Sequence, residues 1–156
     1  MALAAARPAS EVDLQTIVDL AVTAAAQVRD QRGGERFLAS LEPRATDPAS
    51  LLRDLDDDRT MVWCGTFDDV VVGYAVARLV DDDAATIARV TELYIEPEVR
   101  EVGVGEALMS AAIAWAIASG AAGIDAYALP GARETKNLFE RLGLTARLIT
   151  VHRDLR

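Results

Sequence analysis

The sequence predicts an α+β fold in which helices flank a central mixed, mostly antiparallel sheet. Three strand-like runs, residues 60–67, 70–80 and 85–95, follow one another with only short acidic turns between them, as in an antiparallel meander. A glycine-rich loop, a long apolar helix and another strand-like run come next. The strands before and after that helix are therefore expected to be parallel, because a helical crossover connects them.

The N-terminal third is predicted to contain one strand and three helices. Ser10 and Asp13 resemble a capping box, and apolar residues at helical spacing follow them. Asp47 before Pro48 is typical of an N-cap with a first-turn proline. The predicted bounds are 4–9 for the strand, and 10–33, 35–41 and 48–55 for the helices.

The C-terminal third is predicted to alternate helices and strands. Gly120 ends an apolar helix, and Gly143 has the position of a helix C′ residue. No internal repeat or linker interrupts the chain, so residues 1–156 are predicted to form a single domain. The predicted elements are a helix over 106–119, a strand over 123–129, a helix over 132–142 and a final strand over 145–152.

Composition excludes several classes of function. The net charge of −9 argues against a nucleic-acid partner, because binding to phosphate backbones requires a basic surface. An acidic surface instead attracts cationic small molecules or basic peptides. No cysteine and histidine spacing resembles a zinc site, so no metal is expected.

The single cysteine, Cys64, rules out an internal disulfide and indicates a reducing compartment. The first six residues lack the charged leading region of a signal peptide, so we expect a cytoplasmic protein. Residues 107–124 carry no charge over a length that could span a bilayer. Because alanine, serine and glycine dominate them, we interpret them as a buried helix, a turn and a strand start, with no membrane partner.

The glycine loop, residues 100–105, is the strongest functional signal. It follows a strand and opens a helix, so several backbone N–H groups and the positive helix end point toward one place. Gly103 and Gly105 allow a ligand to approach the backbone closely. Arg100 adds a charged donor, and the pattern predicts a phosphate-binding loop.

Three blocks of sequence are similar to the GNAT superfamily of acyl-CoA-dependent N-acetyltransferases. The glycine loop resembles the family's pyrophosphate loop, R-x-x-G-x-G. Residues 92–97 resemble its central strand, and residues 138–144 resemble its closing helix. The element order also looks like the GNAT fold across nearly the whole chain. The resemblance implies an enzyme that transfers an acetyl group from acetyl-CoA, as co-substrate, to an amine of a small cationic molecule or peptide.

The resemblance also implies which residues contact the acetyl-CoA. They lie on the central strand, in the glycine loop with the helix start, and on the closing helix, where Lys136 is either a phosphate ligand or a solvated helix residue. A backbone N–H near Tyr94 or Ile95 is expected to hold the oxyanion. The implied residues are Leu93, Tyr94, Ile95, Arg100, Glu101, Val102, Gly103, Val104, Gly105, Glu106, Lys136 and Phe139.

Glu92 is the candidate general base. An alkylammonium has a pKa near ~10, so a group must take its proton before the nitrogen attacks. Strand alternation places Glu92 on the same face as Tyr94. The alternative role is that of an exposed or salt-bridged strand carboxylate.

Three residues depart from the family pattern. Phe139 replaces a tyrosine that often protonates the leaving thiolate, and Ala132 replaces an asparagine that contacts pantetheine. Glu101 adds a negative charge to the phosphate loop. A water molecule or Tyr127 would then donate the proton, although Tyr127 is also suited to be a wall of the pocket. These departures support a second hypothesis, an acyl-CoA-binding module with weak or no catalysis.

We also expect a homodimer. The helix around Trp115 and Ile117 is apolar on nearly every side, and the last strand has the composition to pair across subunits.

Overall fold

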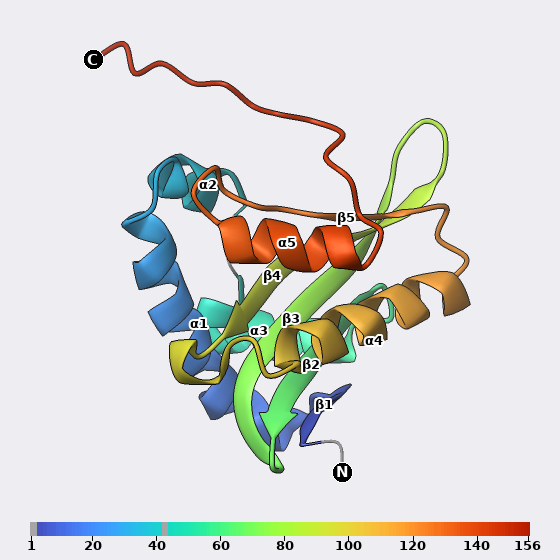
Figure 1. Cartoon of the computed structure of the whole chain (residues 1–156). Helices are drawn as coiled ribbons and strands as arrows, with labels where there is room; N and C mark the ends of the chain where they lie inside the picture. Colours follow the sequence, from blue (N-terminus) through green and yellow to red (C-terminus); the bar gives the residue numbers. More distant parts are fainter. Residues whose placement is uncertain (1–2, 42–43) are drawn as a thin grey trace.

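A five-stranded sheet crosses the computed structural model, which describes residues 3–41 and 44–156 (Figure 1). The strands lie in sequence order, with antiparallel pairing throughout except between the last two, which are parallel. This arrangement confirms the α+β class and the mixed, mostly antiparallel sheet. Of the N-terminal stretch examined for a signal peptide, residues 1 and 2 lie outside the described part. The strands are β1 (Ala4–Pro8), β2 (Thr60–Phe67), β3 (Val70–Asp81), β4 (Thr86–Ile95) and β5 (Ile124–Ala126).

Helices cover both faces of the sheet (Figure 1). On one face lie α1 (Leu14–Arg29) and α3 (Pro48–Asp56), with α2 (Gly34–Leu41) packed against α1. On the other lie α4 (Val104–Ala118) and α5 (Arg133–Arg141).

Two of the predicted helix starts have the expected capping contacts. The Ser10–Asp13 capping box precedes a 3-10 turn, Glu11–Asp13, that leads into α1, and α1 ends at Arg29, before the glycine pair predicted to end it. Asp47 accepts the Ser50 N–H at 3.2 Å, and Asp13 accepts the Ser10 N–H at 3.0 Å.

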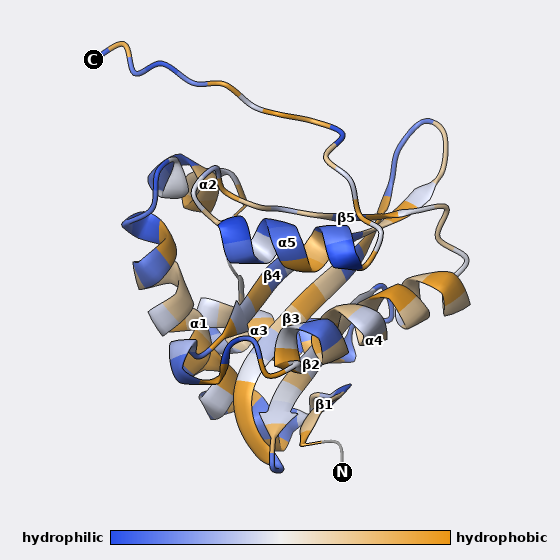
Figure 2. Cartoon of the chain, in the orientation of Figure 1, coloured by the Kyte–Doolittle hydropathy of each residue, from blue (hydrophilic) through white to orange (hydrophobic). Residues whose placement is uncertain are grey.

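Each helix layer has its own core, because alternate residues of the central strands point to opposite faces. Figure 2 shows the apolar character of the sheet and of α4. One core includes Ile17, Leu51 and Val76, and the other includes Val90, Leu108, Met109 and Phe139, all of them buried.

A β-bulge interrupts the alternation in β4. Val76 pairs with Glu92 whereas Ala77 pairs with Val90, so Thr91 is the extra residue. As a result Val90 and Leu93 pack in the same core, and Tyr94 lies in the opposite one.

Strand β5 is shorter than the 123–129 predicted. It pairs with β4 over three residues only, and the last pair is Val90 with Ala126. The bulge at Thr91 follows at once, and beyond it the two strands part. Because strand length depends on a partner, the residues after Ala126 lose their strand pairing even though their composition favours it.

The predicted final strand over residues 145–152 is wrong. In the described part of the chain no strand follows β5, and the tail runs away from the body after Arg147 contacts Asp125 (Figure 1). Leu148, Ile149 and Val151 are 77%, 79% and 89% exposed. Their β propensity is real, but no neighbouring strand of the same chain takes up their backbone hydrogen bonds.

Residues 107–124 form most of α4, a turn and the first residue of β5. Within the described ranges, no helix has the length and hydropathy needed to span a bilayer. One side of α4 is buried against the sheet through residues such as Leu108 and Ala112.

Candidate active site

A cavity of about 920 Å³ opens where β4 and β5 part. Its walls come from β4, the glycine loop, helices α1 and α2, and the segment that leads from β5 into α5. This size is in the range of cofactor and ligand sites. Loss of strand pairing after Ala126 therefore creates the cavity.

The glycine loop leads directly into α4. Gly103 is the N-cap residue with φ 101° and ψ −1°, a left-handed conformation that favours glycine. The first bond of the helix runs from the Ala107 N–H to the Gly103 carbonyl at 2.9 Å, so the N–H groups of residues 103–106 have no acceptor within the helix. These donors and the positive helix end suit an anion.

Gly105 has a different role from Gly103. A Cβ at residue 105 would lie 3.1 Å from Leu138 and 3.3 Å from Ile95, which is tighter than ordinary contact. The missing side chain therefore lets α5 and the end of β4 approach the helix start closely. The neighbouring Val104 points inward and is buried.

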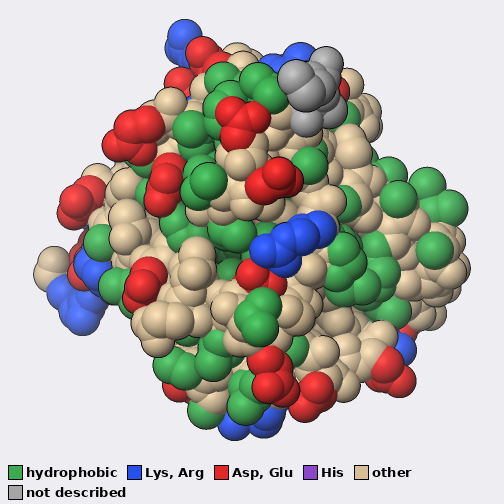
Figure 3. Space-filling view, turned by 90° about the horizontal axis from the view of Figure 1, so that it is seen from below, with side chains coloured by type: hydrophobic (Ala, Val, Ile, Leu, Met, Phe, Trp, Pro, Cys, Tyr) green, Lys and Arg blue, Asp and Glu red, His purple; other side chains and the backbone are tan. Residues whose placement is uncertain are grey.

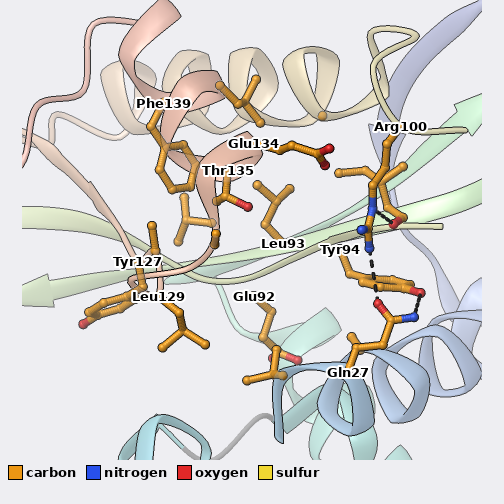
Figure 4. Close-up of a pocket in the computed structure, with 18 of the residues that line it drawn as sticks. Gln27, Glu92, Leu93, Tyr94, Arg100, Tyr127, Leu129, Glu134, Thr135 and Phe139 are labelled. Atoms are coloured by element: carbon orange, nitrogen blue, oxygen red, sulfur yellow. Dashed lines mark hydrogen bonds between the residues drawn. The ribbon is translucent and has the colours of Figure 1, made fainter. Parts of the chain in front are cut away.

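Arg100 lies against the end of β4 (Figure 4). Its Nε donates to the Ile95 carbonyl at 2.9 Å, and Nη2 donates to Gln27 Oε1 at 3.3 Å. The guanidinium carbon is 5.6 Å from the centre of the Tyr94 ring, within cation–π distance. Gln27 also donates to the Tyr94 hydroxyl at 3.1 Å. These contacts fix one rim of the cavity, and contact between Arg100 and a phosphate stays a prediction.

Glu92 lines the cavity on the side of α1 and α2 (Figure 4). The Tyr74 hydroxyl donates to Oε1 at 3.0 Å, and the Ala45 N–H donates to Oε2 at 3.4 Å. Burial raises the pKa of Glu92, and the two hydrogen bonds offset part of that rise. A raised pKa makes the carboxylate a stronger base than an exposed glutamate.

Tyr74 and Arg78 both influence the charge state of Glu92. Burial and the charge of Glu92 raise the pKa of Tyr74 well above its usual value, so Tyr74 remains a phenol and a donor. Arg78 pairs with Asp54 through two bonds of 2.9 and 3.0 Å. Because the Arg78 guanidinium is bound to Asp54, the hydrogen bonds to Glu92 come from the Tyr74 hydroxyl and the Ala45 backbone N–H.

The two sides of β4 face different parts of the cavity. Glu92 and Tyr94 point toward α1, whereas Leu93 points toward α5 and Phe139 (Figure 4). A ligand between the parted strands would therefore have the carboxylate on one side and apolar side chains on the other.

The structure brings together most of the residues singled out in the sequence. Lys136 does not line the cavity, and its Nζ donates to the Pro130 carbonyl at 3.1 Å. Val104 is buried beneath the loop. The residues that do line it are Glu92, Leu93, Tyr94, Ile95, Arg100, Glu101, Val102, Gly103, Gly105, Glu106 and Phe139.

Sequence reasoning missed Tyr74, Gln27 and Phe37. The signal for Tyr74 was the hairpin register, which pairs Tyr74 with Tyr94 and brings it next to Glu92. Phe37 lies edge-on to Tyr127, with ring centres 5.8 Å apart, and both line the cavity.

In the described part of the chain, Cys64 and the clusters of acidic side chains show no features of a second site. Burial raises the pKa of the Cys64 thiol to about 12, so it stays protonated and unreactive at neutral pH. Within residues 3–41 and 44–156, no three histidine, cysteine, aspartate or glutamate side chains cluster as metal ligands do. Asp and Glu side chains are spread over the surface seen in Figure 3, in line with the net charge of −9.

Comparisons with known proteins agree with this architecture. The model of the acetyltransferase (GNAT) family matches residues 20–144. A tetramutant of the BH1408 protein from Bacillus halodurans superposes with a TM-score of 0.78 at 17% identity, over 96% of this chain and 99% of that chain. A GCN5-related N-acetyltransferase from Ralstonia eutropha JMP134 gives 0.72 at 20% identity, over 97% and 98%.

A third solved structure carries a ligand. It is AAC(6')-Iy in complex with the bisubstrate analog CoA-S-monomethyl-acetylneamine, with a TM-score of 0.69 at 19% identity, over 97% of this chain and 98% of that chain. At such identities the likeness to solved structures shows the fold. No curated protein sequence matches the chain.

Proposed function

We propose that this chain, which belongs to the GNAT acetyltransferase family, is an N-acetyltransferase that moves an acetyl group from acetyl-CoA to an amine. One observation carries the proposal. A single cavity has, at one end, a helix start whose free N–H groups suit an anion and, at the other, the partly buried Glu92 carboxylate, whose pKa is raised. Residues 1–156 act as one domain in this proposal.

The cavity offers matching groups for each part of acetyl-CoA. The free N–H groups of residues 103–106 suit the pyrophosphate, because they lie at the start of a helix. Beyond Val90, β5 no longer pairs with β4, so the pantetheine arm has room to lie along residues 91–95. Leu93 and Phe139 provide an apolar wall for it. The AAC(6')-Iy complex with a CoA-containing analog supports this assignment by analogy of fold.

Glu92 supplies the base that the reaction needs. Its carboxylate takes a proton from the incoming ammonium, directly or through one water molecule, and the neutral nitrogen then attacks the thioester carbonyl. The N–H of Tyr94 or Ile95 stabilises the developing oxyanion. As the carbon–sulfur bond breaks, the nitrogen gives its remaining surplus proton to water and becomes the amide N–H. The sulfur leaves as thiolate and is protonated by water or by Tyr127, since Phe139 has no proton to give.

A second candidate function is an acyl-CoA-binding module with weak or no catalysis. Phe139 and Ala132 favour it, because both lack the polar groups that the family often has at these positions. It predicts the same acetyl-CoA affinity but no amine-dependent release of thiol.

Two measurements on the purified chain separate these functions. Calorimetric titration with acetyl-CoA measures binding, and a thiol reagent measures CoA release across a panel of amines. Binding together with amine-dependent release supports the acetyltransferase, and binding without release with any amine favours the module. Absence of acetyl-CoA binding would overturn both.

A further inference from the structure

The amine side of the cavity is lined largely by apolar side chains, with Gln27, Gln31 and the Tyr74 hydroxyl as uncharged polar groups among them. Helices α1 and α2 and the segment after β5 contribute small and large apolar side chains around the Glu92 carboxylate (Figure 4). They include Ala21, Ala25, Val28, Phe37, Leu38 and Leu129.

Among the described residues, negative charge on this side comes from one group. Of the described residues that line the cavity, four are acidic, and three of them, Glu101, Glu106 and Glu134, lie in the glycine loop, at the start of α4 or at the start of α5. Glu92 alone comes from the part of β4 that faces α1.

The one partly buried carboxylate, Glu92, can balance one ammonium group. A second ammonium in the same chamber would lose its hydration without a partner, and unpaired buried charge is strongly unfavourable. An apolar substituent on the same amine would instead bury its surface against the walls.

The walls also contain an aromatic pair suited to a ring. Phe37 and Tyr127 meet edge to face, with an interplanar angle of 70°. An aryl group of the acceptor can add a further edge or stacking contact to this pair. Tyr127 is 37% exposed, so its ring is accessible from the cavity.

We infer that the acceptor is a primary monoamine with an aliphatic or aromatic body, and that amines with a second cationic group near the first are discriminated against. This inference rests on the proposed function and adds the acceptor class to it. It differs from an expectation based on the net charge of −9, which attracts a dication more strongly than a monocation to the cavity mouth.

A matched pair of amines provides the test. Hexylamine and cadaverine have chains of the same length. Hexylamine ends in a methyl group where cadaverine has a second ammonium group. With saturating acetyl-CoA, kcat/KM from thiol release should be at least tenfold higher for hexylamine. Equal values, or a preference for cadaverine, would overturn the inference.

Two variants locate the selectivity. Ala25→Asp adds a carboxylate to the chamber wall and should reduce the hexylamine preference at least threefold. Val22→Asp places the same change on the outer side of α1, where Val22 is 54% exposed, and should leave the ratio unchanged. Equal effects of the two variants would contradict the assignment of the cavity wall at Ala25 as the source of the selectivity.

Phe37→Ala is an independent probe should Ala25→Asp fail to fold. Phenethylamine should lose more kcat/KM than hexylamine does, because only the aryl amine uses the ring pair. An equal loss would count against the aromatic subsite. If acetyl-CoA binds but no amine releases thiol, the proposed function itself fails, and the acceptor class fails with it.

Discussion

Replacement of Gly103 by alanine tests how the glycine loop works. A side chain at φ 101° costs about 1–2 kcal/mol, and a Cβ there would lie 3.5 Å from Ala4, an ordinary contact. The variant should therefore fold, with a melting temperature lower by about 2–8 °C. Relaxation of the strain rotates the N–H groups at the start of α4. Loss of one charge-assisted hydrogen bond, about 1.5–3 kcal/mol, should raise the Kd for acetyl-CoA at least tenfold.

Gly120→Ala is the matched control. Gly120 ends the same helix region with φ 73°, and nothing lies within 4 Å of its Cβ position. It should lose a similar amount of stability and keep the affinity of the native protein. Calorimetric titration and thermal unfolding of both variants are the assays. If both variants keep native affinity, or lose it equally, the loop does not bind the pyrophosphate as argued.

The other predictions concern stability, catalysis and assembly. The Arg7 guanidinium lowers the pKa of Asp13 from 3.8 to about 2, so this pair stabilises the fold above pH 4 and loses its effect as the pH falls through about 2. Asp13→Asn should lower the free energy of unfolding in urea at pH 7 by about 1–2 kcal/mol, a modest loss because water screens the half-exposed Arg7. Equal stability of the variant and the native protein would refute the contribution of this ion pair. Phe139→Tyr restores a hydroxyl beside the cofactor and should raise turnover or leave it unchanged; a clear fall would show that the site geometry differs from the family's. The homodimer stays a prediction, and light scattering should give twice the mass of one chain. Removal of residues 145–156, the segment expected to pair across subunits, should lower the measured mass to that of one chain. A native monomer at micromolar concentration would contradict this prediction.

Local signals predicted most of the fold. The bounds of β2 are those predicted, because β-branched and aromatic residues between polar turns mark a strand without reference to the rest of the chain. The start of α3 follows from Asp47 and Pro48 alone, since capping involves only neighbouring residues. The GNAT-like arrangement then followed from the order of such elements.

The missed features depend on contacts between distant residues. The length of β5 is set by the bulge at Thr91, and residues 145–152 lack a strand partner although their composition is that of a strand. The bond from Tyr74 to Glu92 depends on hairpin register, which the sequence pattern alone did not specify. Burial of Val104 likewise depends on how α4 packs against β2, where Gly65 leaves space for it.

The candidate site was predictable in outline. Alternation along β4 placed Glu92 and Tyr94 on one face, which the structure shows. The apolar lining from α1 and α2 was not predicted, because residues such as Ala25 and Phe37 carry no chemical signal until the fold brings them to the cavity.

The most direct test of amine acetylation with Glu92 as the base is the activity of Glu92→Gln. Thiol release from acetyl-CoA with an accepted amine should fall by roughly a hundredfold or more in kcat, the scale of a lost general base, while acetyl-CoA affinity stays native. Glu98→Gln is the control, since Glu98 is exposed, precedes the glycine loop and lies outside the cavity lining, and it should keep native turnover. Full activity of Glu92→Gln on that amine would contradict the mechanism.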